Sequence, residues 1–311
     1  MGLDISLLET FLLVARLGSF SKAARRLGLS QPAVSLQVKV LEKEVGASLI
    51  DRAPGRVQLT PAGHVACRHA RGVLKERDRL MAGIPRATGD VSGNLLMAAS
   101  TIPGEFLLPS IAARFYRACP GVKVFIDTTD TRGVAAQLRE MRIELGFTGA
   151  PLEDAEIHEE HFAHDRLVVI TPADHPLGSG GPVLPADLVG VPFVGRTRGS
   201  GTVRVLVDAL AGQGISPGDL DVVAEFGSTQ AAVSAVQSGM GISVVSQKAA
   251  WLPAQNGLLR MVEVTGVDLS RPFFAVRHRD RVLSLAAETF LEFCLAPPPG
   301  FQTEPPDAGD P

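Results

Sequence analysis

The sequence predicts a multi-domain α/β protein, with a small helical front domain, a long connecting helix and a larger α/β body. Three observations predict this class: the length of 311 residues, apolar residues at helical spacing near the N-terminus, and strand-then-helix alternation after about residue 93. The composition, 45% hydrophobic and 20% charged, is that of an ordinary globular protein. We expect the parts to be residues 1–60, 61–88 and 92–295, with a disordered Pro-rich, acidic tail at 296–311.

Residues 1–58 predict three short helices, because apolar side chains recur there at helical spacing. Ser30 is suited to be the N-cap of the third helix, Pro32 lies in its first turn, and Gly46 ends it. The segment Asp51–Gly63 places a Pro-Gly turn between short extended pieces and predicts a small hairpin. The expected inward stripes are Leu7, Phe11 and Val14; Phe20, Ala23, Ala24 and Leu27; and Val34, Val38, Leu41 and Val45.

The outward face of the third helix is suited to the DNA major groove, since its leading residues are small or polar. A glutamine can pair with an adenine edge, an alanine or leucine can meet a thymine methyl, and lysines can lie over phosphates. From periodicity alone, a helical hairpin that merely packs is an equal alternative. The candidate DNA-contacting residues of this helix are Ser30, Gln31, Pro32, Ala33, Ser35, Leu36 and Lys39.

The charge distribution supports a polyanion as partner of the front part. The net charge of −3 combines fourteen Lys and Arg against eight Asp and Glu in residues 1–90 with sixteen against twenty-five in the remainder. A front with net charge +6 on a body with net charge −9 suggests that only the front meets nucleic acid. Solvated basic helices are common, so this signal is weak by itself.

The body predicts an α/β fold with largely parallel sheets. The helical stretches expected between its strands are Leu107–Arg117, Gly133–Arg142 and Gln230–Ser238. The expected strands are Asn94–Ser100, Val122–Thr128, Ile143–Gly149, Arg166–Pro172, Val191–Gly195, Asp221–Phe226, Gly241–Ser246 and Pro272–Arg277.

Small polar residues gather where these strands end, which predicts a binding site for a small anion. Ligands of open α/β sheets bind beyond the carboxyl ends of strands, where helix N-termini offer unpaired N–H groups. A single Ser or Thr is more often an N-cap than a ligand contact, so the recurrence at successive strands favours a pocket. The candidate effector-binding residues are Ser100, Thr101, Ile102, Thr128, Thr129, Thr148, Gly149, Arg198, Ser200, Thr202, Ser228 and Thr229.

The stretch from Leu3 to Gly63, with "FSKAARRLGLSQPAVSLQVKVLE" at its centre, closely resembles the winged helix-turn-helix of LysR-type transcriptional regulators. The resemblance implies that the hairpin is the wing, with Arg52 and Arg56 near the DNA backbone, and that the following helix pairs two subunits. Leu36 stands where many relatives have arginine, which puts a guanine contact there in doubt. The expected subunit seam is Val65, Ala66, Ala70, Val73, Leu74, Leu80, Met81 and Ile84.

The body resembles the two-lobed effector-binding domain of the same family, which is related in fold to periplasmic binding proteins. The matching segments are "STIPGEFLLP" and "EFGSTQAAVSAVQSGMGISVVS". The resemblance implies a first lobe of residues 92–163 and 270–295 and a second of 164–269, with crossings near His161–Arg166 and Val267–Pro272. The first segment is most similar to members linked to sulfur or selenium metabolism, which favours a small oxyanion or sulfur metabolite.

Together these features predict a homo-oligomeric, ligand-responsive DNA-binding regulator of the cytoplasm, not an enzyme, with RNA polymerase as a candidate further partner. We expect no cofactor and no membrane segment. His158, His161 and His164 could hold a transition metal on a helix, but the pattern around them is strand-like and would scatter the imidazoles, so no metal is expected. The alternative is a cytoplasmic small-molecule-binding protein or enzyme with a helical dimerisation segment.

Overall fold

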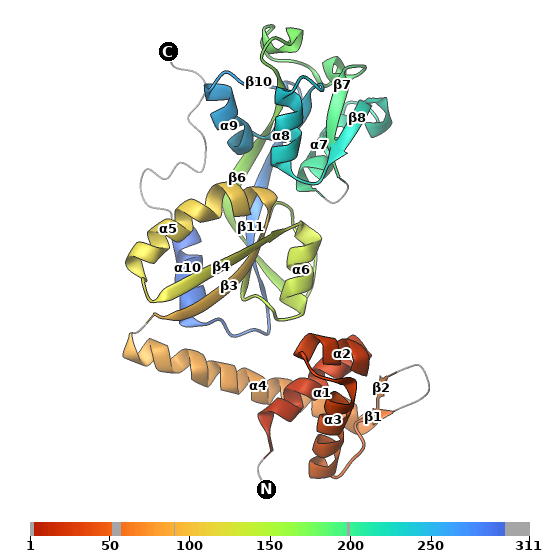
Figure 1. Cartoon of the computed structure of the whole chain (residues 1–311), viewed down its shortest axis with the longest axis vertical. Helices are drawn as coiled ribbons and strands as arrows, with labels where there is room; N and C mark the ends of the chain where they lie inside the picture. The colour runs from red at the N-terminus through yellow and green to blue at the C-terminus, as the bar shows by residue number, and fades with distance from the viewer. Residues whose placement is uncertain (1–2, 52–56, 90, 198–199, 296–311) are drawn as a thin grey trace. The chain divides into compact units, whose positions relative to one another are not determined.

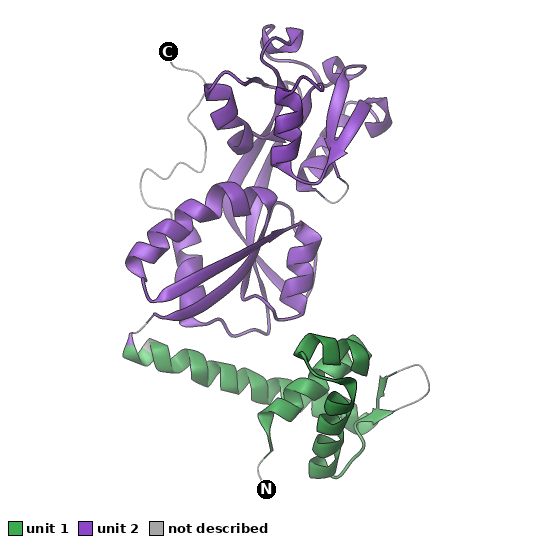
Figure 2. Ribbon diagram, in the orientation of Figure 1, with its two compact units in different colours: residues 1–88 green, residues 89–311 purple. Residues whose placement is uncertain are grey.

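The structure is a computed structural model that describes residues 3–51, 57–89, 91–197 and 200–295 (Figure 1). The chain divides into two compact units, Met1–Thr88 and Gly89–Pro311 (Figure 2). The predicted wing contacts Arg52 and Arg56, the candidate Arg198 and the tail 296–311 lie outside the described residues. Within the described ranges, no helix combines the length and apolarity needed to span a bilayer.

The first unit begins with three helices that start at polar caps and end at glycines. The side chains of Asp4, Ser19 and Ser30 accept the cap bonds, and Gly18, Gly28 and Gly46 adopt positive φ, which glycine reaches without strain. The helices are α1 (Ile5–Leu17), α2 (Phe20–Leu27) and α3 (Gln31–Val45). Local sequence therefore sets both the ends of these helices and the tight break between α2 and α3.

The predicted stripes form the core of the first unit, with two exceptions. Phe11, Val14, Val34 and Val38 are 0% exposed, as expected for inward positions. Leu27 and Val45 were predicted to face inward but are 37% and 45% exposed. Each is the last residue of its helix, where the chain turns at a glycine and leaves the core, so helical periodicity alone overestimates their burial.

A short hairpin and a long helix complete the first unit. Strands β1 (Ile50–Asp51) and β2 (Gln58–Leu59) pair antiparallel, and α4 runs from Pro61 to Thr88. The Glu42 carboxylate accepts hydrogen bonds from the backbone N–H groups of Leu49 (2.8 Å) and Ile50 (3.1 Å), which fixes the hairpin on α3. Arg77 of α4 forms an ion pair with Glu9 of α1, so the long helix is also tied to the first helix of the domain.

The second unit is built on a sheet with strand order β10-β6-β11-β5-β3-β4, and β9 also pairs with β6. β3 pairs in parallel with β4 and β5, but β6 and β11 pair antiparallel with every named neighbour. The expectation of largely parallel sheets is therefore wrong, because both strands that join the lobes enter the sheet antiparallel. The strands are β3 (Gly93–Ser100), β4 (Val122–Thr129), β5 (Leu145–Thr148), β6 (Ile157–Pro172), β9 (Ser243–Ser246), β10 (Leu259–Val262) and β11 (Ser270–His278).

The long strand β6 connects two lobes of the second unit (Figure 1). Its first part, up to Arg166, pairs with β11, and from Leu167 onward it pairs with β9 and β10. The partner change thus falls at Arg166–Leu167, at the end of the segment where the first crossing is expected. A β-strand carries the chain between lobes here because each half finds a different neighbour to satisfy its backbone.

The remaining strands, β7 and β8, pair in parallel as a two-stranded sheet, and helices pack against the sheets of both lobes. The first lobe has its core around Phe115, Phe147 and Phe290, and the second has cores around Val169 and Val233. Sequence patterns missed β10 and the helices α7, α9 and α10. Besides three short 3-10 helices (Pro176–Gly178, Pro185–Leu188 and Pro217–Asp219), the remaining elements are the π-helical turn Pro103–Leu107, α5 (Leu108–Ala118), α6 (Thr131–Arg139), β7 (Pro192–Arg196), α7 (Gly201–Ala211), β8 (Asp221–Phe226), α8 (Thr229–Gln237), α9 (Gln247–Gln255) and α10 (Leu285–Leu295).

Candidate functional site

The N-terminal half of α3 presents an accessible face opposite its buried one. Gln31 and Pro32 are exposed, and Leu36 is 62% exposed. Lys39, about one turn after Leu36, is also exposed. Ala33 and Ser35 are half-buried. The Ser30 hydroxyl accepts a hydrogen bond from the Ala33 N–H (3.3 Å), so Ser30 caps the helix. The predicted residues therefore share one end and one face of α3, with short side chains that let the helix end approach a surface closely.

Helix α4 exposes an apolar stripe over most of its length. Val65, Val73, Leu80, Met81 and Ile84 are 43–63% exposed, which is unusual for large apolar side chains at regular spacing. The other predicted seam residues differ. Ala70 is 3% exposed in the core of the first unit and Ala66 packs against that core, because the start of α4 lies against its own domain.

A cavity of about 570 Å³ lies between the two lobes of the second unit, at the carboxyl ends of β3, β4, β5, β7 and β8. The N-termini of α6, α7 and α8 also reach it. The predicted candidates that line it are Ser100, Thr101, Ile102, Thr128, Thr129, Gly149, Ser200, Thr202, Ser228 and Thr229. Thr148 does not line it, since its side chain is fully buried.

Some of the predicted hydroxyls are already used within the protein. Ser228 accepts a hydrogen bond from the Ala231 N–H (3.1 Å) as the N-cap of α8, and Ser200 accepts one from the Thr202 N–H (3.3 Å) as the N-cap of α7. The Ser100 hydroxyl, in contrast, is buried and makes no hydrogen bond with any described residue. Because buried hydroxyls are nearly always paired, Ser100 is a strong candidate to contact a ligand.

Sequence reasoning did not name the charged residues that line the described part of the cavity, which are Glu105, Asp130, Arg196 and Arg271. Arg196 and Arg271 are only 7% and 5% exposed, so each is a buried cation. Asp130 and Arg196 were within reach of sequence analysis, since each lies within two residues of the end of a predicted strand, and Glu105 lies in the segment "STIPGEFLLP" that carries the family resemblance. Arg271 is the second residue of β11 and lies in the predicted crossing segment Val267–Pro272, but no sequence pattern marked it as a cavity residue.

Arg196 projects from the end of β7 and is held by uncharged acceptors. Its Nε donates to the Phe226 carbonyl (3.1 Å) and its Nη2 to the Gly227 carbonyl (2.9 Å), while Nη1 donates to the Thr229 hydroxyl. No carboxylate of the described residues lies within ion-pair distance of it. Burial lowers the pKa of Arg196, the charge of Glu105 partly offsets this shift, and the charge of Arg271 adds to it.

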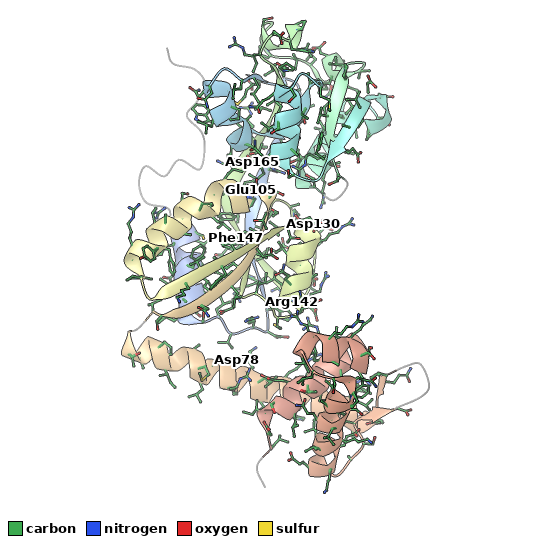
Figure 3. The ribbon with its side chains drawn as sticks, viewed as in Figure 1. Asp78, Glu105, Asp130, Arg142, Phe147 and Asp165 are labelled. Atoms are coloured by element: carbon green, nitrogen blue, oxygen red, sulfur yellow. The ribbon has the colours of Figure 1, made fainter. Side chains whose placement is uncertain are left out.

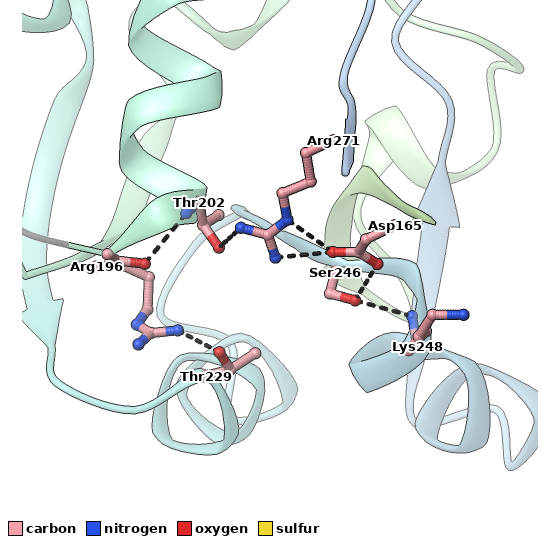
Figure 4. A network of polar contacts seen from close by, with 8 residues as sticks. Asp165, Arg196, Thr202, Thr229, Ser246, Lys248 and Arg271 are labelled. Carbon is pink, nitrogen blue, oxygen red and sulfur yellow. Dashed lines mark hydrogen bonds and ion pairs between the residues drawn. The ribbon is translucent and has the colours of Figure 1, made fainter. Parts of the chain in front are cut away.

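Arg271, unlike Arg196, is paired with a carboxylate (Figure 4). Its Nε and Nη2 contact Oδ2 of Asp165 at 2.9 and 2.7 Å, and its Nη1 donates to the Thr202 hydroxyl at 3.3 Å. The other carboxylate oxygen of Asp165 accepts from the Ser246 hydroxyl at 2.6 Å. The Phe273 ring lies 5.2 Å from the guanidinium carbon. The pair links β11 and β6 to α7 at the junction of the lobes, and its charges cancel.

The two acidic residues of the described cavity lining, Glu105 and Asp130, are labelled in Figure 3 and differ in their hydrogen bonds. Asp130 accepts a hydrogen bond from the Gly133 N–H (2.6 Å) and caps α6. Glu105, on the turn after β3, makes no hydrogen bond with another described residue. Partial loss of hydration raises the pKa of Glu105, and the charge of Arg196 acts in the opposite direction.

The histidine cluster of β6 differs from expectation in one respect. The segment is a strand as predicted, but it does not scatter all the imidazoles, since a bulge opposite Phe273 and Phe274 brings the rings of His161 and His164 to 4.2 Å. Among the described residues, no three His, Cys, Asp or Glu side chains are arranged to hold a metal ion.

Comparison with known proteins gives two family matches that together span most of the chain. Residues 5–64 match the bacterial regulatory helix-turn-helix protein, lysR family, and residues 88–297 match the LysR substrate binding domain. An uncharacterized HTH-type transcriptional regulator of Methanocaldococcus jannaschii is 35% identical, covering 94% of this chain and 99% of its own. A RuBisCO operon transcriptional regulator of Allochromatium vinosum is 33% identical, covering 95% and 97%.

Solved structures of similar fold include a full-length OxyR variant of Pseudomonas aeruginosa, with TM-score 0.67, 19% identity and coverage of 95% of this chain and 94% of that one. Full-length CbnR complexed with its target DNA has TM-score 0.57, 22% identity and coverage of 94% and 99%. The regulatory domain of Synechocystis CcmR in complex with 2-PG has TM-score 0.61, 24% identity and coverage of 66% and 96%. These likenesses confirm the predicted fold class.

Proposed function

The chain belongs to the LysR family of transcriptional regulators, and from this premise we propose that α3 reads operator DNA while a small anion in the interlobe cavity controls the response. Family members are DNA-binding regulators with an effector-binding domain, which sets aside the alternative of an enzyme with a dimerisation helix. The site of action that we propose is the cytoplasm, where the chromosomal operator lies.

The proposed DNA contacts are those of the exposed end of α3, together with Arg52 and Arg56 of the wing segment. Support comes from the opposite burial of the two helix faces: Val34 and Val38 are fully buried, while Gln31 and Leu36 are open. Leu36 can meet a thymine methyl and cannot donate to guanine, so this subsite favours an A·T pair.

The observation that carries the effector proposal is the buried guanidinium of Arg196, which lines the cavity and donates hydrogen bonds only to uncharged acceptors. A buried cation without a counter-ion is costly, and an anionic ligand would remove that cost. The unpartnered Ser100 hydroxyl and the nearby helix N-termini add donors for the same ligand. Synechocystis CcmR, whose regulatory domain has a similar fold, was solved with the small ligand 2-PG.

We assign the effector to small oxyanions and sulfur-containing anions, on the basis of the segment "STIPGEFLLP" and the low aromatic content of 5%. The relative from Allochromatium vinosum is named for a RuBisCO operon, so carbon-metabolism anions are the second class to test. Effector binding must favour one arrangement of the DNA-binding domains over another, since equal affinity for both arrangements would shift nothing.

We further propose a homo-oligomer paired through the exposed stripe of α4. Two linked recognition helices read half-sites about one helical turn apart and gain effective concentration. RNA polymerase is a candidate further partner of such an assembly.

DNA footprinting and gel-shift titration on the upstream region test the DNA assignment. Gln31→Ala combined with Ser35→Ala should remove sequence-selective binding and leave folding and anion binding unchanged. Glu44→Ala, an exposed position near the other end of α3, is the matched control and should bind DNA like the wild type. Selective binding that survives the double change would refute the assignment of α3 as the recognition helix.

A further inference from the structure

We infer that the effector is a bifunctional anion, which places its negative group on Arg196 and a hydroxyl or ammonium donor on Glu105. Glu105 is then the residue that selects the effector class. This inference rests on the proposed function, because it names the chemistry of the ligand that the same cavity takes.

Two of the four charged residues in the described lining of the cavity already have partners within the protein. Arg271 is neutralised by Asp165 through contacts of 2.9 and 2.7 Å. Asp130 caps α6 through the Gly133 N–H. Arg196 and Glu105 are therefore the two charged groups of the described cavity lining that remain for a ligand.

Not all N–H donors of Arg196 are used in hydrogen bonds to described residues. A guanidinium carries five N–H groups, and the hydrogen bonds to Phe226, Gly227 and Thr229 use three of them. Two N–H groups therefore remain, which suits the two oxygens of a carboxylate, sulfonate or phosphate group. Because the Arg196 side chain is only 7% exposed, water has little access to these two N–H groups.

Glu105 is held in place from the first lobe, facing the same cavity as Arg196. The backbone before it packs closely on β3 and β4, since a Cβ on Gly104 would lie 3.0 Å from the Thr128 hydroxyl and 3.2 Å from the Ala99 Cβ. Glu105 itself has no hydrogen-bond donor among the described residues, and its pKa is raised by partial loss of hydration. It therefore repels a ligand that is only an anion and accepts from a ligand that also carries a donor.

The two groups belong to different lobes, so a ligand that satisfies both must bridge the cavity. Arg196 ends β7 of the second lobe and Glu105 follows β3 of the first. A simple oxyanion reaches only the Arg196 side and still meets the unpaired Glu105 carboxylate. A hydroxylated or aminated acid satisfies both sides, and it joins the lobes while it does so.

Isothermal titration of the full-length protein with three sulfonates of nearly equal size tests the inference. Ethanesulfonate has no donor, 2-hydroxyethanesulfonate has a hydroxyl, and 2-aminoethanesulfonate has an ammonium group. We expect the two donor-bearing sulfonates to bind roughly tenfold or more tightly than ethanesulfonate, the effect of one hydrogen bond to a charged group. In Glu105→Gln the preference for the ammonium compound should fall below about threefold, and ethanesulfonate should bind more tightly than to the wild type.

Matched variants separate the outcomes. Glu292→Gln, an exposed carboxylate of α10 that does not line the cavity, should keep the wild-type preference. Glu105→Ala serves as a second variant and should lose the preference as well.

If Arg196→Met abolishes sulfonate binding while Glu105→Gln keeps the donor preference, this inference alone is overturned. If Arg196→Met leaves sulfonate binding unchanged, the proposed anion cavity itself is wrong. Wild-type binding of all three weaker than about 1 mM also overturns the inference.

Discussion

Replacing Asp165 by Asn tests the buried ion pair at the junction of the lobes. The Asp165 and Arg271 side chains are 0% and 5% exposed, and Asp165 provides the one carboxylate that faces Arg271 among the described residues. Breaking one side of such a pair leaves an uncompensated buried charge, which costs about 3–5 kcal/mol. Asn keeps one oxygen acceptor for the guanidinium, so we expect a loss near the lower end, about 3 kcal/mol.

Urea unfolding followed by the fluorescence of Trp251 measures this loss, since Trp251 is the sole tryptophan and lies on α9 of the second unit. With an m value of about 2 kcal/mol/M, the midpoint should fall by about 1.5 M. Glu263→Gln is the matched control, because it removes an exposed ion pair next to Asp165. This pair joins Glu263 to Arg166, and their side chains are 52% and 54% exposed. Such exposed pairs contribute below about 1 kcal/mol, so this midpoint should move by less than about 0.5 M.

Two further measurements sharpen the test. In Asp165→Asn the Arg271 guanidinium, which lines the cavity, has lost its counter-ion, so sulfate should bind roughly tenfold more tightly than to the wild type. The double change Asp165→Leu with Arg271→Met should recover most of the stability, because it removes both buried charges. A midpoint for Asp165→Asn equal to that of Glu263→Gln would refute the reasoning, since the pair would then be no more desolvated than a surface pair.

The remaining predictions concern packing, protonation, salt and assembly. Gly63→Ala should unfold the first unit, as measured by circular dichroism, because the added Cβ would lie 2.0 Å from the Leu49 carbonyl oxygen. Gly72→Ala on the same helix is the control, since its Cβ would have no atom within 4 Å and the change should raise helix stability by about 1 kcal/mol. Equal melting temperatures of the two variants would contradict the assigned clash. The pKa of Glu105 is raised, and its neutral form, which does not repel an anion, is fully populated only well below that pKa. The affinity for ethanesulfonate should therefore fall as the pH rises through the pKa of Glu105. The other charged groups of the described cavity lining are Asp130, Arg196 and Arg271, and an ethanesulfonate affinity that does not change with pH would argue against the role of Glu105. The logarithm of the operator-binding constant should fall linearly with the logarithm of salt concentration, by about 0.9 per phosphate contacted, and a flat gel-shift series would exclude phosphate contacts. Leu80→Glu, which places a charge in the exposed stripe of α4, should shift light-scattering mass toward the monomer, and an unchanged mass would place the subunit interface elsewhere.

The front domain was predictable because its signals are local. Ser30, Pro32 and Gly46 set the ends of α3 through hydrogen bonds and backbone preferences that involve neighbouring residues only. Helical periodicity then identified the buried face, and it failed for Leu27 and Val45, where the helices leave the core. The recurrence of small polar residues after strands likewise indicated the cavity, because parallel strands bring their carboxyl ends to one edge.

The character of the cavity, in contrast, depends on contacts that no local pattern contains. Asp165 and Arg271 are 106 residues apart in the chain. They meet because the antiparallel pairing of β6 and β11 places these two residues opposite each other. That pairing also decided that the crossings are strands and that the sheet is mixed. The same register neutralises Arg271 and leaves Arg196 as the buried cavity cation that has no ion pair with a described residue.

The sequence by itself thus determined the helix-turn-helix and the position of the polar strand ends, since hydrogen bonding within a few residues and apolar spacing suffice for both. Tertiary structure alone decided which charges face the ligand and which are neutralised. The physical reason is that burial and ion pairing are properties of the packed chain, in which residues far apart in sequence exclude water from one another.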